Sequence, residues 1–249
     1  MAAISSISPA SRSGTAAAAA GASVRQRLLT ATARLIYRDG ITATGVESIA
    51  AAASVAKMSL YRHFPGGKDE LVAAALAKRS RDVVGRLLAD ARRLASASDP
   101  HGADQPGPVA TILAVFDVVD RQTQQPHWRG CPFLNAAAEL PQEHPGRAVV
   151  LAHKRDLNEH LAGLVRDAGL DPAEHLASIL VLLLDGALAA SALTPEEHPA
   201  ALARGVAAGL LGGPHNHSAP ASPELATVVA TTASRGPENL PGPVAPRRA

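Results

Sequence analysis

Basic and polar side chains gather in a short stretch of this 249-residue chain, between Lys57 and Lys68. Their chemistry suits a polyanion, because Lys and Arg bind phosphate oxygens and Arg can donate two parallel hydrogen bonds to a guanine edge. Residues 23–68 include seven basic and two acidic side chains, whereas the whole chain has a net charge of only +2. A basic segment on a slightly acidic remainder indicates nucleic-acid binding. The alternative is an ordinary solvated basic helix.

Two short helices and a tight turn are needed to position these side chains. The first is predicted to start at Thr44, with Glu47 three residues later in the spacing of a capping box. Its apolar residues share one face at helical spacing, and they are Val46, Ile49, Ala50 and Ala53. After residues 54–56, a second helix over 57–64 turns Leu60 and Phe64 inward. Helix, three-residue turn and basic helix is the pattern of a helix-turn-helix that binds the DNA major groove.

The same stretch resembles the TetR family of one-component repressors. The resemblance is carried by TGVESIA, VAKMSLYRHF and PGGKDEL, and with the preceding helix it covers residues 24–76. It implies groove contacts from the start of the second helix and phosphate contacts near its end. With Thr44 added, the candidate DNA contacts are Thr44, Lys57, Met58, Ser59, Tyr61, Arg62, His63 and Lys68.

Two positions depart from the family pattern. Ser54 stands where the family usually has Gly, and a side chain in a left-handed turn costs on the order of 1 kcal/mol. Ala56 stands where the family usually has Ser or Thr, so the hydroxyl that would cap the second helix is missing.

The composition predicts an all-α fold. Hydrophobic residues make up 47% of the chain but aromatic residues only 2%, so Ala and Leu must form the core. A first helix is expected over 23–39, capped by Ser23 and ended by Gly40, and a long one over 68–97. Further helices are expected over 109–125, 132–140, 147–168, 172–193 (capped by Asp171) and 199–211. We expect disorder in the Ala/Ser-rich residues 1–22 and in residues 212–249, which include seven prolines.

The second half also resembles one branch of the family, through RGCPFLNAAAE at 129–139 and LDGA at 184–187. The resemblance implies three-helix DNA binding by residues 23–67, and an effector-binding and dimerisation domain over 68–211. Two subunits would pair through residues 172–211 into a four-helix bundle. The residues favour the same conclusion, because an apolar helix followed by an Ala/Gly-rich one lacks internal partners to cover it.

Apolar side chains with a few polar ones suit a small hydrophobic or aromatic effector. The candidates are Phe116, Asp120, Trp128, Cys131, Phe133, Asn135, His153 and Asp185. Each has an alternative role in the core or on a helix surface, and a surface position is preferred for His153 and His160. Cys131 is either an electrophile or oxidant sensor, helped by Arg129, or a buried small residue.

An enzyme is not expected, because no nucleophile–base pair or metal cluster has an interpretable spacing. No cofactor or metal is expected either, although His215 and His217 form a weak metal-binding candidate. A single cysteine excludes an intrachain disulfide, no signal peptide is recognised, and the apolar run 179–184 is too short to cross a bilayer. The sequence thus predicts a cytoplasmic, ligand-responsive homodimeric repressor; constitutive or activating regulation stays open.

Overall fold

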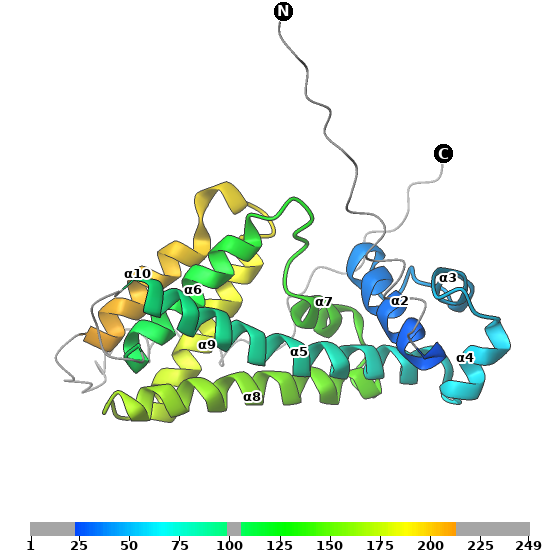
Figure 1. The fold of residues 1–249 in the computed structure, drawn as a ribbon, viewed down its shortest axis with the longest axis horizontal. Helices are drawn as coiled ribbons and strands as arrows, with labels where there is room; N and C mark the ends of the chain where they lie inside the picture. The colour runs from blue at the N-terminus through cyan, green and yellow to red at the C-terminus, as the bar shows by residue number, and fades with distance from the viewer. Residues whose placement is uncertain (1–22, 99–105, 213–249) are drawn as a thin grey trace, which may run out of the picture. The chain divides into compact units, whose positions relative to one another are not determined.

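The computed structural model describes residues 23–98 and 106–212, and within these ranges every regular element is helical (Figure 1). The all-α prediction is therefore confirmed. The predicted N-terminal arm, most of the predicted tail, and the histidines at 215 and 217 lie outside the described residues.

Three short helices come first: α2 (Val24–Asp39), α3 (Val46–Ala52) and α4 (Lys57–His63). Ser23 caps α2 as predicted, since its hydroxyl accepts a hydrogen bond from the amide of Gln26 at 3.2 Å. Gly40 ends the helix at φ 89°, a left-handed conformation that costs a glycine little. The buried side chains of the three helices share one cluster with the start of the next helix, and they include Leu28, Leu35, Ile49, Leu60 and Phe64.

The long helix α5 (Gly67–Ser98) connects this part of the chain to the rest (Figure 1). It packs against α2 at its beginning and against α6 (Pro108–Thr123) and α8 (Pro145–Asp167) further along. Leu71 and Ala75 belong to the N-terminal cluster. Val72 and Leu76 belong to a second cluster with α7 (Pro132–Glu139). The buried residues from Val84 onward belong to a third. One helix thus contributes to all three hydrophobic clusters.

The third cluster is formed by α5, α6, α8, α9 (Ala173–Ala190) and α10 (Pro199–Gly212), with a 3-10 turn at Pro195–Glu197. Prolines occupy the first turn of α6, α7 and α8, where a missing amide hydrogen costs nothing. Apart from the end of α9, the predicted boundaries of these helices agree with the structure to within about two residues.

Three predicted details are wrong. The capping box at the start of α3 does not form: Gly45 is the N-cap, and no side chain bonds to it. Asp171 does not cap α9, because the N-cap is Pro172 and no side chain caps that end. Helix α9 ends at Ala190 rather than near residue 193, where its last turn gives way to hydrogen-bonded turns at Leu193 and Thr194.

Helix α9 is covered only in part within one chain, as the lack of internal partners predicted. Leu176, Leu180 and Leu184 are buried, whereas Leu182 is 72% exposed. Among the described helices, α9 is the one that is long and apolar enough to cross a membrane, with a mean hydropathy of 1.6 over 18 residues. Core helices of soluble proteins meet the same criterion.

Candidate nucleic-acid interface

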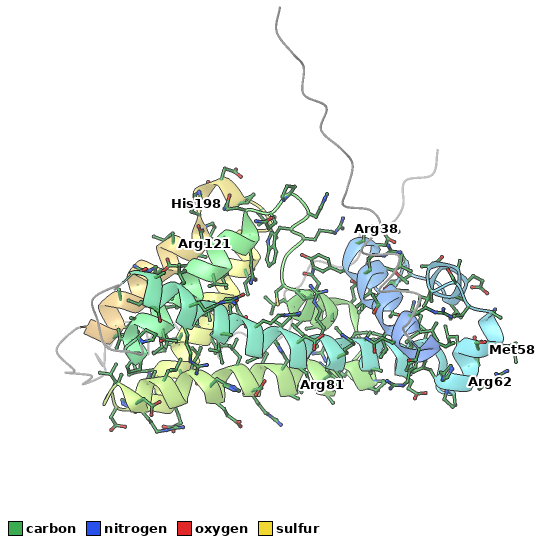
Figure 2. All side chains as sticks on the ribbon, in the orientation of Figure 1. Arg38, Met58, Arg62, Arg81, Arg121 and His198 are labelled. Atoms are coloured by element: carbon green, nitrogen blue, oxygen red, sulfur yellow. The ribbon has the colours of Figure 1, made fainter. Side chains whose placement is uncertain are left out.

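Helix α4 has a buried side and an exposed side. Leu60 and the capping residue Phe64 are fully buried in the N-terminal cluster, and the guanidinium of Arg25 lies 5.1 Å from the centre of the Phe64 ring. On the opposite side Met58 is 71% exposed and Tyr61 40% exposed. Figure 2 shows Met58 and Arg62 projecting outward from α4. The packing of one side therefore fixes which side chains the helix offers to a partner.

The turn before α4 contains Ser54 and Ala56, the two residues that depart from the family pattern, and both behave as predicted. Ser54 adopts φ 54°, in the left-handed region where the family usually has Gly. The amide of Val55 donates to the carbonyl of Ala50 at 3.0 Å, which holds the turn against the end of α3. Ala56 is the N-cap of α4 and provides no side-chain hydrogen bond, so no side chain caps the amides of Lys57 and Met58. The amide of Ser59 donates to the carbonyl of Ala56 at 2.8 Å.

Lys57 forms an ion pair with Glu47 of α3, ten residues earlier in the chain. The hydrogen bond from Lys57 lowers the pKa of the Glu47 carboxyl, and the same bond raises the pKa of the Lys57 ammonium. Both side chains are largely exposed. A predicted DNA contact thus already has an anionic partner, which sequence reasoning missed because it assigned Glu47 to the capping box.

The residues predicted to bind phosphate surround the connection from α4 to α5. Tyr61 and His63 are exposed on α4, and Lys68 is half-buried in the first turn of α5. Gly67 adopts φ 68°, and a Cβ atom there would lie 3.5 Å from Cε1 of Tyr61. The ring of Tyr61 therefore lies next to the start of α5, where the remaining first-turn amides and an ammonium group can bind one phosphate together. The amide of Gly66 already donates to the Glu70 carboxylate at 2.8 Å.

Thr44 does not fit the predicted set of contacts. Its side chain is 2% exposed, and its hydroxyl donates to the carbonyl of Gly40 at 2.7 Å. The hydroxyl proton is used in that bond and the side chain is buried, so Thr44 cannot donate to a phosphate and is not among the candidate contacts. No side-chain cap bond forms at the start of α3 either.

Two side chains that sequence reasoning did not single out join these helices to the C-terminal part. Glu139, at the end of α7, accepts hydrogen bonds from the amides of Ile41 at 2.7 Å and Thr42 at 3.0 Å. The Tyr37 hydroxyl on α2 accepts from the amide of Arg129 at 2.9 Å and donates to the carbonyl of Gly130 at 3.2 Å. Contacts across more than ninety residues leave no local sequence signal.

The structure separates most of the predicted ligand-binding residues. Phe133 and His153 come together, with ring centres 3.6 Å apart and nearly parallel planes. Nδ1 of His153 lies 3.0 Å from the hydroxyl of Ser80. His153 is 5% exposed, so the preferred surface position is wrong for it, whereas His160 is exposed as expected. Burial lowers the pKa of His153 to about 4, and Lys154 adds to the effect.

The other candidates occupy different surroundings. Phe116 is fully buried in the third cluster, and Cys131 is 7% exposed in the second. Asp120 binds His198 at 2.9 Å, while Asp185 pairs with Lys154. The Asn135 amide donates to the carbonyl of Arg129 at 2.8 Å. Trp128 alone among them lines a cavity of about 880 Å³ between α2 and α5.

Comparisons with known proteins agree with this architecture. A sequence model of the bacterial regulatory proteins of the tetR family matches residues 28–75. The HTH-type transcriptional regulator LmrA of Bacillus subtilis is 35% identical over 66 residues, which span 26% of this chain and 35% of that protein.

Two solved structures are similar over nearly their whole length. SCO4454, a TetR-family transcriptional regulator of Streptomyces coelicolor, is 32% identical, with a TM-score of 0.66 over 82% of this chain and 96% of that one. A TetR transcriptional regulator of Streptomyces avermitilis is also 32% identical, with a TM-score of 0.60 over 84% and 98%. These relatives are DNA-binding regulators, not enzymes. The identity and coverage of these structures show that the chain belongs to the TetR family of transcriptional regulators.

Proposed function

We propose that this regulator is a homodimeric repressor that leaves a palindromic operator when a small molecule binds. Helix α4 of each subunit would read one half-site in the cytoplasm. DNA binding would belong to residues 23–67, and effector binding and dimerisation to residues 68–211. The observation that carries the proposal is an apolar face on α9 and α10 that a single chain leaves uncovered.

Large apolar side chains are exposed on both of these helices. Leu182 is 72% exposed and Leu193, just after α9, 84%; on α10, Leu202 is 74% and Val206 49% exposed. Glycines lie on the same two helices at 186, 205 and 209, and outside their own helix backbone and chain neighbours no atom lies within 4 Å of where their Cβ atoms would be. Small residues next to leucines let a second helix pair approach closely, so a two-fold copy of the same face is a suitable partner.

Release by an effector needs a mechanical connection between the two parts of the chain. The bonds of Glu139 to the α2–α3 connection and of Tyr37 to residues 129 and 130 supply such a connection. A ligand that shifts α5 or α7 would move α2 and change the distance between the two recognition helices. That distance must be about 34–36 Å for successive major grooves. A coupling of about 1–3 kcal/mol would weaken operator binding about 5–150-fold.

Sedimentation equilibrium tests the dimer. The wild-type chain should be a dimer at micromolar concentration, whereas Leu182→Glu and Leu202→Glu should be monomeric because each buries a charge at the interface. Leu151→Glu is the matched control, since Leu151 is 57% exposed on α8, outside the apolar face. A monomeric wild-type protein, or dissociation caused equally by Leu151→Glu, would contradict the proposal.

Selection of genomic DNA fragments followed by footprinting tests operator reading. We expect a protected palindrome with half-sites about one helical turn apart. Tyr61→Ala and Lys68→Ala should weaken binding to all sequences, whereas Arg62→Ala should relax the preference at one base pair. Unchanged selectivity in Arg62→Ala would remove that assignment. Unchanged operator affinity in the presence of a saturating ligand would remove effector release.

Sensing through Cys131 receives less support. The thiol lies in a hydrophobic cluster with Phe133 and Val150 and is 7% exposed, which favours a packing role.

A further inference from the structure

A cleft of about 880 Å³ lies between α2, α5 and the segment that precedes α7. It is within the size range of small-molecule sites, and it is distinct from the hydrophobic cluster where Phe133 stacks on His153. Part of its wall is apolar, from Leu29, Ala33, Ala75 and Val83. Two aromatic side chains, Tyr37 and Trp128, complete this part of the lining.

The charged lining is almost entirely basic. Six Arg or Lys side chains line the cleft, against one acidic side chain, Asp82. Arg38 pairs with Asp39, and Lys78 pairs with Asp82. The other four basic side chains of the lining are Arg34, Arg79, Arg86 and Arg129. Among the described residues, no carboxylate lies within ion-pair distance of their guanidinium groups. Such an excess of one sign attracts an anion into a concave surface.

Two buried hydrogen-bond donors at the cleft lack an acceptor among the described residues. They are Nε of Arg79 and the indole Nε1 of Trp128. An unpaired buried donor costs about 1–3 kcal/mol, so a ligand oxygen that enters the cleft and reaches one of these atoms offsets that cost. Burial also lowers the pKa of the Arg79 guanidinium, with a further contribution from Arg86. The guanidinium carbon of Arg79 lies 4.9 Å from the centre of the Tyr37 ring, which holds the side chain beside an aromatic face.

We propose that this cleft binds a small aromatic carboxylate. The carboxylate would accept hydrogen bonds from Arg79 and Arg129, since a guanidinium fork matches two carboxylate oxygens. The planar apolar body would pack against Trp128 and the aliphatic wall. A neutral aromatic compound would leave the guanidinium charges unpaired, so charge is the main determinant of specificity.

The position of the cleft gives the ligand a route to the DNA-binding helices. Tyr37 lines the cleft, and its hydroxyl holds the backbone of residues 129 and 130. A ligand between α2 and the 126–129 segment would therefore change how α2 is held against α5. This regulatory consequence rests on the proposed function; the binding site itself does not.

The test uses the full-length chain and two readouts. Calorimetric titration compares benzoate, phenylacetate and naphthoate with their neutral amides, benzamide, phenylacetamide and naphthamide. Trp128 is the single tryptophan of the chain, so its fluorescence emission reports directly on the cleft. At least one carboxylate should bind saturably, at least about tenfold more tightly than its amide, and change this emission.

Variants then locate the binding site. Arg79→Gln and Arg129→Gln should each weaken carboxylate binding by about tenfold or more. Arg81→Gln, which removes the same charge from an exposed position of α5 outside the cleft lining, should leave binding unchanged. Arg129 is exposed, so its replacement tests the site even where Arg79→Gln destabilises the fold.

Equal affinity for carboxylates and amides, unchanged affinity in Arg129→Gln, equal losses in Arg81→Gln, or no saturable binding by any of the three acids would each overturn the proposal. These titrations contain no DNA. Carboxylate binding with the expected variant pattern, together with unchanged operator affinity, would therefore refute effector release and leave the site in place.

Discussion

The carboxylate of Glu139 provides a direct test of how the two parts of the chain are joined. One oxygen accepts hydrogen bonds from the amides of Ile41 and Thr42, in the connection between α2 and α3. Glu139→Ala removes both bonds, whereas Glu139→Gln keeps an oxygen but removes the charge. Both variants change a side chain outside the hydrophobic clusters, so any effect comes from the polar contact.

The expected magnitude follows from the kind of bond. A hydrogen bond to a charged group contributes roughly 1.5–3 kcal/mol when water is excluded, and less at an exposed site such as this one. We therefore expect Glu139→Ala to lower the free energy of unfolding by about 1–3 kcal/mol, and Glu139→Gln by about half as much. For a chain of this size, each kcal/mol lowers the melting temperature by about 2–4 °C.

Thermal unfolding followed by circular dichroism measures the effect. Glu143→Ala is the matched control, because Glu143 is exposed nearby and its side chain forms no hydrogen bond with the described residues. A melting temperature for Glu139→Ala within about 1 °C of the Glu143→Ala value would refute the reasoning. Operator binding, measured on the same proteins, should weaken in Glu139→Ala, because the position of α2 becomes less restricted.

Three further changes test the recognition element and the buried histidine. Ser54→Gly should raise the free energy of unfolding in urea by about 0.5–1 kcal/mol, because glycine adopts φ 54° without strain; a lower value would contradict this. Glu47→Gln frees Lys57, so affinity for all DNA should rise and the slope of log affinity against log salt should steepen by roughly 0.9; an unchanged slope would mean that Lys57 contacts no phosphate. The pKa of His153 is about 4 in the folded chain, below the ordinary 6.5, so between pH 6.5 and 4 the imidazole is protonated in the unfolded chain but not in the folded one. The free energy of unfolding should therefore fall as the pH falls from 6.5 to 4, by at most about 3 kcal/mol. His153→Phe keeps an aromatic ring but should lose this pH dependence of the free energy of unfolding. An identical pH dependence in the wild-type and variant proteins would rule out His153 as its source.

Features that depend on local sequence could be predicted. The Ser23 cap, the end of α2 at Gly40, and the inward positions of Leu60 and Phe64 follow from neighbouring residues alone, and the structure confirms them. The left-handed turn at Ser54 was also expected from its place in the motif.

Features that depend on contacts between distant segments could not. Thr44 and Glu47 have the spacing of a capping box, but Thr44 bonds back to Gly40 and Glu47 pairs with Lys57. Helical spacing shows that Phe116 and Phe133 face inward, but it does not show which helix each one meets. Phe116 joins the α5, α6 and α9 cluster, while Phe133 stacks on His153, so no single site contains both.

Helix α5 also limits how this protein can be recombined with its relatives. Leu71 and Ala75 complete the N-terminal cluster, so a chimaera joined at residue 67 would give the DNA-binding helices a foreign wall. None of residues 77–83 belongs to a hydrophobic cluster, which makes this interval the least disruptive place to exchange one sensory half for another. A chimaera joined there keeps Leu71 and Ala75 packed against the DNA-binding helices α2 to α4. It divides the cleft, however, so the new sensor would have to provide its own ligand site.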